Sequence, residues 1–67
     1  MRSERALLVR DAIAELPDGQ ADAVRLRYLE GLTIAETSQR LARSEAAVKA
    51  LVSRGLETLA RRISEAR

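Results

Sequence analysis

Residues 33–49, TIAETSQRLARSEAAVK, decide the fold because they contain two helix starts separated by a very short connection. Thr33 and Glu36 have the spacing of a capping box, in which the threonine hydroxyl accepts a hydrogen bond from the glutamate N–H and the glutamate carboxylate accepts one from the threonine N–H. A helix is therefore expected over residues 34–41. Eight residues are too few for a helix that is stable alone, so this helix has to pack on its neighbours.

The second helix start is Ser44, whose hydroxyl can cap the helix, while the charge of Glu45 suits the positive end of the helix dipole. Apolar residues then recur on one face for about five turns, at Val48, Val52, Gly55 or Leu56, Leu59 and Ile63. This pattern predicts a helix over residues 45–63. Gly55 costs about 1 kcal/mol relative to alanine inside a helix, which indicates either a close contact with another helix or a bend.

Two further helices are expected before this pair. Residues 3–16 form the first helix, with Ser3 as its N-cap and an apolar face of Ala6, Val9, Ile13 and Leu16. Pro17 disfavours helical geometry at the residue before it, and Asp18-Gly19 is typical of a turn. Residues 20–29 form the second helix, with apolar positions at Ala23, Val24, Leu26 and Tyr28, and Gly31 supplies the left-handed residue that commonly ends a helix.

The composition agrees with an all-α fold and excludes several classes of function. The 67 residues include twelve alanines and ten leucines, which are good helix formers, and a single aromatic residue. The chain has no cysteine and no histidine, so disulfides, the usual zinc and haem ligands and the common catalytic triads are absent. We expect one small four-helix domain over residues 1–67 that is not an enzyme and needs no cofactor or metal. No segment approaches the ~20 apolar residues of a membrane span, which favours a cytoplasmic protein with neither a membrane nor a small molecule as its partner.

The distribution of charge favours a nucleic-acid partner near the C-terminal end. The net charge is +2, but residues 1–20 carry −1, residues 21–42 are neutral and residues 43–67 carry +3. Two helices of about eight and eighteen residues joined by a three-residue turn have the dimensions of a helix-turn-helix, which ordinary corners between helices share. The second helix begins with short, polar or basic side chains, which let a helix approach base edges. These residues favour the DNA-binding form of the motif.

Several sequence blocks, in their order and spacing, resemble region four of bacterial sigma factors, and the small extracytoplasmic-function group most closely. The blocks are Leu16-Pro17, residues 23–33 (AVRLRYLEGLT), Ala35-Glu36, Arg40-Leu41, residues 44–49 (SEAAVK), Ser53-Arg54 and Leu59. The resemblance covers about residues 6–63, and its specificity comes from the blocks taken together.

The resemblance implies a domain that docks on the beta flap of the RNA polymerase core and places its last helix in the major groove of the minus-35 promoter element. By the same resemblance, the residues at the groove-facing start of that helix are Arg43, Ser44, Glu45, Ala47 and Lys49. Ser53 and Arg54 would meet the phosphate backbone, and Thr33 and Arg40 would lie near the flanking phosphates. The structural alternatives are that Thr33 and Ser44 are only caps, that Glu45 serves only the helix dipole, and that Arg54 is solvated or ion-paired.

Four residues depart from the family pattern. Thr37 and Ser38 put hydroxyls where the supporting helix normally meets the core, Leu51 stands where many members carry arginine, and Gly55 stands where alanine is usual. We expect these changes to reduce stability or to alter DNA contact without removing the fold. The sigma regions that bind the minus-10 element and the polymerase clamp have no counterpart in the 67 residues, so the sequence leaves open a fragment of a longer sigma factor or a stand-alone domain.

Two other functions stay open at this point. A response-regulator output domain uses a similar four-helix arrangement, although the Leu16-Pro17 junction and residues 26–33 (LRYLEGLT) favour a sigma factor. A protein-interaction module would bind polymerase, an anti-sigma factor or another regulator without contacting DNA. The low net charge and Leu51 favour this second alternative.

Overall fold

The computed structural model describes the backbone of residues 4–65 and the side chains of residues 8–65. All regular structure in this part of the chain is helical. Helix α1 spans Glu4–Ala14, α2 spans Asp18–Val24 and continues into a π-helical segment η1 over Arg25–Leu29, α3 spans Ile34–Leu41, and α4 spans Glu45–Glu65. The prediction of an all-α, four-helix fold is confirmed. Ser3, the expected cap of the first helix, and the side chain of Ala6 lie outside the described residues.

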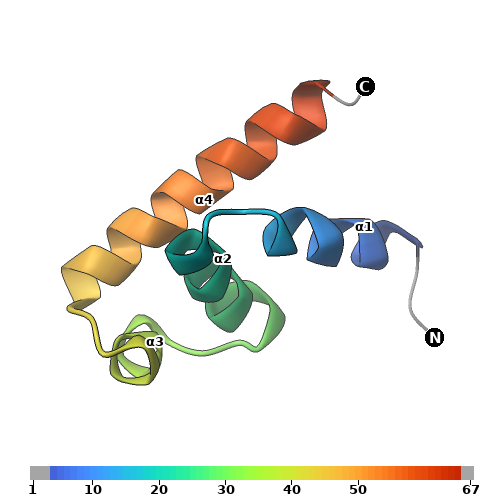
Figure 1. Ribbon diagram of the computed structural model, residues 1–67. Coiled ribbons are helices and arrows are strands. Elements are labelled where there is room, and N and C mark those ends of the chain that lie inside the picture. Colours follow the sequence, from blue (N-terminus) through green and yellow to red (C-terminus); the bar gives the residue numbers. More distant parts are fainter. Residues whose placement is uncertain (1–3, 66–67) are drawn as a thin grey trace.

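The longest helix, α4, is the element on which the others pack (Figure 1). Helix α2 lies against the middle of α4, and α1 lies beside α2 towards the C-terminal half of α4. Helix α3 lies at the N-terminal end of α4. In Figure 1, α3 is seen almost end-on, whereas α4 runs across the view, so the axes of the two helices cross steeply. The connection between α3 and α4 therefore lies at one end of the molecule.

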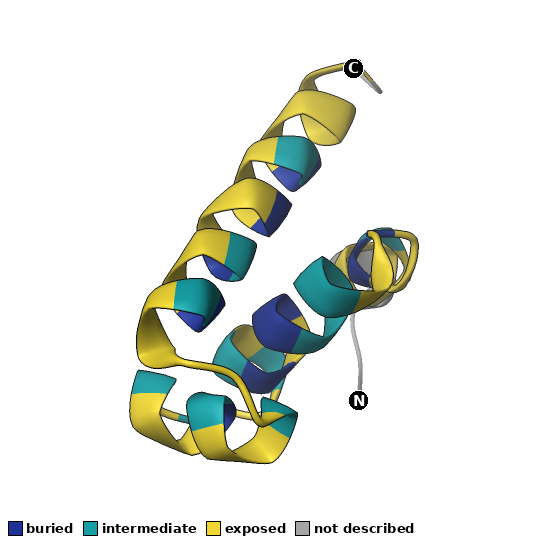
Figure 2. Cartoon of the chain, turned by 60° about the vertical axis from the view of Figure 1, so that its left-hand side comes forward, coloured by how far each residue is buried: buried dark blue, intermediate teal, exposed yellow. Residues whose placement is uncertain are grey.

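Two clusters of buried side chains hold the helices together, and α2 contributes to both. One cluster joins α1, α2 and α4 and consists of Ile13, Leu16, Val24 and Leu59. The other joins α2, α3 and α4 and consists of Ala23, Val48 and Val52, with Ile34, Leu41 and Leu51 packed against them. Figure 2 shows that the buried positions of α4 follow one side of the helix, while its other side is exposed. One long face of α4 is thus left to solvent.

Gly55 lies where α4 packs closely against α2. A methyl group at this position would lie 2.6 Å from Cγ2 of Val24, which is far inside van der Waals contact. Glycine is therefore required for the two helices to pack at this distance. Of the two explanations that the sequence offers for Gly55, the close helix contact is confirmed.

The first two helices have different limits from those that the sequence predicts. Helix α1 ends at Ala14, two residues before the expected end, because the chain turns there ahead of Pro17. Helix α2 begins two residues early because Pro17 has extended backbone angles (φ −52°, ψ 146°) and its carbonyl accepts a hydrogen bond from Ala21 N at 2.8 Å. Asp18 and Gly19 consequently form the first turn of α2 and not a loop.

The apolar faces that the sequence assigns to α1 and α4 are longer than the covered parts of these helices. Val9 is 40% exposed and Ile63 is 55% exposed. Each lies one turn beyond a buried residue of the same helix, Ile13 in α1 and Leu59 in α4. The apolar period of α1 and α4 continues beyond the part of each helix that its neighbours cover. The prediction that Val9 and Ile63 are core residues is therefore wrong.

Tyr28, assigned by the sequence to the apolar face of the second helix, is also exposed, at 56%. It lies in η1, where the wider π-helical winding changes the register of the side chains. The segment ends with a hydrogen bond from Glu30 N to Arg25 O at 3.0 Å, and Gly31 follows with φ 75°, the left-handed conformation that the sequence predicts. The Arg27 guanidinium lies 5.8 Å from the centre of the Tyr28 ring.

Candidate nucleic-acid interface

Side chains cap both helix starts of the α3–α4 unit. Glu36 N donates to Thr33 Oγ1 at 3.0 Å and Thr33 N donates to Glu36 Oε1 at 2.8 Å. The pKa of Glu36 is lowered below its ordinary 4.5, chiefly because the Thr33 backbone N–H donates to the carboxylate, with smaller contributions from the Thr33 side chain and the Arg40 charge. Ala47 N donates to Ser44 Oγ at 3.1 Å. The capping box and the Ser44 cap are confirmed.

Both of the unexpected hydroxyls of α3 are satisfied by backbone carbonyls. Thr37 is fully buried, and its Oγ1 donates to Thr33 O at 2.8 Å. Ser38 Oγ donates to Arg43 O and so ties the end of α3 to the turn, in which Ala42 has the left-handed φ of 55°. A buried hydroxyl with a partner avoids the cost of an unsatisfied polar group, which explains how these departures are compatible with the fold.

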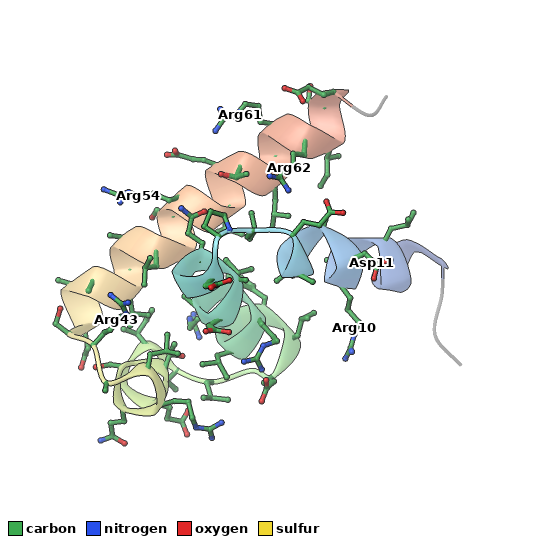
Figure 3. The ribbon with its side chains drawn as sticks, in the orientation of Figure 1. Arg10, Asp11, Arg43, Arg54, Arg61 and Arg62 are labelled. Carbon is green, nitrogen blue, oxygen red and sulfur yellow. The ribbon has the colours of Figure 1, made fainter. Side chains whose placement is uncertain are left out.

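Most of the residues that the sequence assigns to DNA contact are exposed on this unit. The exposed ones are Thr33, Arg40, Arg43, Ser44, Glu45, Lys49, Ser53 and Arg54, and Ala47 is half-buried. Figure 3 shows Arg43 at the turn and Arg54 on the outer side of α4, away from α2. The turn and the first half of α4 thus present these residues to solvent together.

The residues of α4 divide between two flanks of its exposed face. Each residue advances about 100° around the helix axis, so Lys49 and Arg54 lie about 140° apart. Glu45, Lys49 and Ser53 follow one another at intervals of four along one flank, whereas Ala47 and Arg54 lie seven residues apart along the other. The structure therefore brings Glu45 and Lys49 together and separates both from Arg54.

Two exposed alanines, Ala46 and Ala50, lie between these flanks and are missing from the site that the sequence predicts. They occupy the centre of the exposed face, opposite the buried Val48 and Val52. The sequence does contain a signal for these two positions. In a helical projection, Ala46 and Ala50 lie opposite the apolar positions Val48 and Val52.

Leu51, which stands where many family members carry arginine, does not belong to the exposed face. It is half-buried in the cluster that joins α2, α3 and α4. Its Cδ2 lies 3.4 Å from the position that a methyl group would take at Gly19 of α2. Leu51 therefore strengthens the contact between α2 and α4 and leaves the exposed face with one cation fewer than the family pattern.

The cations around the α3–α4 turn and in the first half of α4 take part in none of the ion pairs of the described residues. Within residues 8–65, ion pairs join Arg25 to Asp22 at 3.6 Å and to Glu30, and join Arg62 to Glu15 at 3.6 Å. None of these pairs involves the four cations that the sequence assigns to DNA contact, which are Arg40, Arg43, Lys49 and Arg54. Their charge remains available to a partner.

A separate groove of about 710 Å³ lies between α1 and the α2–η1 segment. Its lining includes the apolar Ile13, Ala14, Ala21 and Leu29 and the charged Arg10, Asp11, Asp18, Asp22 and Arg25. Figure 3 shows Arg10 and Asp11 on α1, on the opposite side of the view from Arg43. Among the described residues, no group of acidic side chains is arranged to hold a metal ion, and no helix has the length and apolarity to cross a membrane.

Two helices joined by a short capped turn, with an exposed and partly cationic second helix, define a helix-turn-helix protein. The chain belongs to the sigma-70 region 4 family, whose model matches residues 6–59. The resemblance found in the sequence is confirmed. The chain is 44% identical over 59 residues to the ECF RNA polymerase sigma factor BldN of Streptomyces coelicolor, in an alignment that covers 88% of this chain and 22% of that protein. It thus spans about a fifth of the length of this relative. No solved structure matches the chain.

Proposed function

We propose that this chain is the promoter-binding domain of a sigma factor and that the start of α4 reads the minus-35 element in transcription initiation. The observation that carries the proposal is the exposed face of the α3–α4 unit in a sigma-70 region 4 chain. Arg40, Arg43, Lys49 and Arg54, the four cations assigned to DNA contact on this unit, form no ion pair within residues 8–65. In this function the chain acts in the cytoplasm and has no catalytic role, in agreement with a sequence without histidine and cysteine.

The proposal assigns different tasks to the residues of this face. Arg43, Ser44, Glu45, Ala47 and Lys49 face the base edges, Ser53 and Arg54 meet the phosphate backbone, and Thr33 and Arg40 lie near the flanking phosphates. The hydroxyls of Thr33 and Ser44 already accept backbone hydrogen bonds, so a DNA contact would use their remaining donor. Their role as caps and their role at DNA are therefore compatible.

The second partner in this proposal is the RNA polymerase core, with its beta flap in the groove between α1 and the α2–η1 segment. The mixed apolar and charged lining of this groove suits a protein segment. It lies away from the α3–α4 turn, so DNA and polymerase are able to bind at the same time. An anti-sigma factor that covered this groove would compete with polymerase and not with DNA.

A protein-interaction module that never contacts DNA is the second candidate. One observation favours it: Leu51 is turned towards α2, so the face that would contact DNA lacks the cation that many family members have at this position. This candidate uses the same groove between α1 and α2 and leaves the α3–α4 face without a partner.

A titration of the chain with duplex DNA at several salt concentrations separates the two candidates. For roughly four neutralised phosphates, log K falls with log salt with a slope of about −3.6. We expect weak binding of an isolated domain, with a modest preference for a duplex enriched from a randomised pool over a scrambled duplex. Binding that is independent of salt, or equally tight to every duplex at physiological salt, contradicts the proposal, and absence of DNA binding favours the interaction module.

A further inference from the structure

Glu45 and Lys49 are the two charged residues on one flank of the exposed α4 face, one helical turn apart. Residues four apart on a helix are neighbours, and glutamate before lysine is the favourable order for their attraction. Both are exposed, and within residues 8–65 neither takes part in an ion pair. The carboxylate and the ammonium group are therefore able to pair with each other or with DNA.

We propose that Glu45 is a specificity-determining residue that acts through Lys49, because it withholds the lysine ammonium from the phosphates of non-cognate DNA. This inference rests on the proposed function, since it requires the start of α4 to face DNA.

The physical reason lies in the partners that the two kinds of DNA offer. On a non-cognate duplex the strongest partner for Lys49 is a phosphate, and moving there breaks its attraction to Glu45 and brings the Glu45 carboxylate towards a like charge. On a cognate duplex, a guanine presents O6 and N7 acceptors to Lys49 and a cytosine presents its N4 amine to Glu45, so that both side chains have a partner. Glu45 consequently weakens binding to random DNA more than binding to the preferred site.

A purely structural role for Glu45 predicts the opposite result. If the carboxylate only complements the dipole of α4, its neutralisation weakens the first turn of the helix and lowers affinity for every duplex. The sign of the change on random DNA therefore distinguishes the two roles.

The experiment compares Glu45→Gln with the matched control Glu65→Gln in the complete 67-residue chain. Glutamine keeps the size of the side chain and removes its charge. Glu65 is an exposed carboxylate at the far end of the same helix, roughly 30 Å away, so its replacement gives the same change in net charge outside the interface. Affinities are measured for the duplex enriched by the parent chain and for a scrambled duplex, and circular dichroism verifies that each variant is folded.

We expect Glu45→Gln to tighten binding to the scrambled duplex by about three- to tenfold and to lower the preference for the enriched duplex. Glu65→Gln should change either affinity by less than about twofold, because screening removes most of the effect of a distant charge. In a Lys49→Ala background the gain from Glu45→Gln should shrink to less than about twofold, because the residue that Glu45 restrains is absent.

The inference is overturned if Glu45→Gln weakens or leaves unchanged the binding of the scrambled duplex, or if its gain is the same size with and without Lys49. In those cases the parent chain still prefers the enriched duplex, so the proposed function survives. If the parent chain discriminates between no duplexes, the proposed function fails and the inference fails with it.

Discussion

Lys49 is the residue for which we expect the largest effect on base reading. It is exposed and lies one turn beyond the Ser44 cap, on the flank that also carries Glu45. Lys49→Ala should cost ~1–3 kcal/mol on the preferred duplex and less on a scrambled one, because a lost base contact matters only where the base is present. Titrations of both duplexes check this expectation.

Base analogues locate the contact on the DNA. Replacing single guanines by 7-deazaguanine removes one acceptor in the major groove. We expect one such replacement to weaken the parent chain and to leave Lys49→Ala unaffected. Equal losses of Lys49→Ala on both duplexes would instead place the lysine on a phosphate.

Arg54 should hold the phosphate backbone, since it lies on the other flank of α4 and further along the helix than Lys49. Arg54→Ala is expected to weaken binding to all duplexes about equally and to reduce the magnitude of the salt slope by about 1. Arg61 provides the control, because it is an exposed arginine seven residues later on the same side of α4, roughly 10 Å further from the turn. Arg61→Ala should leave the slope unchanged, and an equal loss of slope in both variants would contradict a local phosphate contact.

At the scale of the elements, the contact between α2 and α4 limits the stability of the fold. Gly55→Ala places a methyl group 2.6 Å from the buried Val24, and overpacking of this kind costs ~1–3 kcal/mol, against a gain of about 1 kcal/mol in helix propensity. We expect a net loss of about 1 kcal/mol in the free energy of unfolding, measured by urea denaturation.

Gly19→Ala is the comparison for this substitution. Its methyl group would lie 3.4 Å from a terminal atom of the flexible Leu51 side chain, in ordinary contact. This variant should therefore gain stability, by up to about 1 kcal/mol. A second comparison introduces Gly55→Ala into Val24→Ala, where it should cost less than in the parent chain because the shortened side chain leaves space for the new methyl group.

The start of α3 should make the stability of the protein depend on pH. The pKa of Glu36 is lowered in the folded chain, so its contribution is fully present above the ordinary 4.5 and is lost as the pH falls through the lowered value. Glu36→Gln keeps an oxygen acceptor for the capping box and does not titrate. We expect the stability of the parent chain relative to Glu36→Gln to decrease as the pH is lowered below about 4.5, in urea denaturation followed by circular dichroism. A difference that does not vary with pH would contradict a role for the charge.

The elements that the sequence predicts well are those specified by residues close together in the chain. Thr33 and Glu36 define the start of α3 within four residues, and the Ser44 cap is equally local. The π-helical winding of η1 is different, because it depends on backbone bonds between residues five apart, such as the bond from Glu30 N to Arg25 O. No period of apolar residues encodes such bonds, so the exposure of Tyr28 could not be predicted from the pattern.

The candidate site also could be predicted only where it depends on residues close together in the chain. Residue types are enough to select Lys49 and Arg54, and their spacing on a helix places them on different flanks of α4. The burial of Leu51 depends on a partner in α2, which is distant in the sequence. Which of the selected residues contact DNA stays a prediction that the substitutions above test.

At the scale of the whole molecule, two surfaces on different sides are expected to work together. The chain measures 35 × 27 × 15 Å, so it covers few phosphates, and useful promoter affinity should come from tethering to polymerase. Ala14 is exposed and lines the groove between α1 and α2. Ala14→Arg should weaken binding to the beta flap by about tenfold or more while changing DNA affinity by less than about twofold. Pull-down and titration measure the two affinities separately.

The control for this substitution is Ala60→Arg, which adds the same charge at an exposed position of α4 outside the groove. It should leave binding to the flap intact. If both variants lose affinity for the flap equally, or if neither variant loses affinity, the polymerase contact lies elsewhere on the surface.

The exposed tyrosine of η1 has a practical consequence for solution studies. Tyr28 is the only aromatic residue of the chain, so the near-ultraviolet absorbance and emission of the protein come from a single phenol. Because this ring stands 56% exposed beside the Arg27 guanidinium, its emission and its accessibility to a soluble quencher report on one turn of the molecule without any label. A partner peptide that contains no aromatic residue would therefore reveal contact with this turn as a change in quenching, whereas binding at a distant surface would leave the signal unaltered.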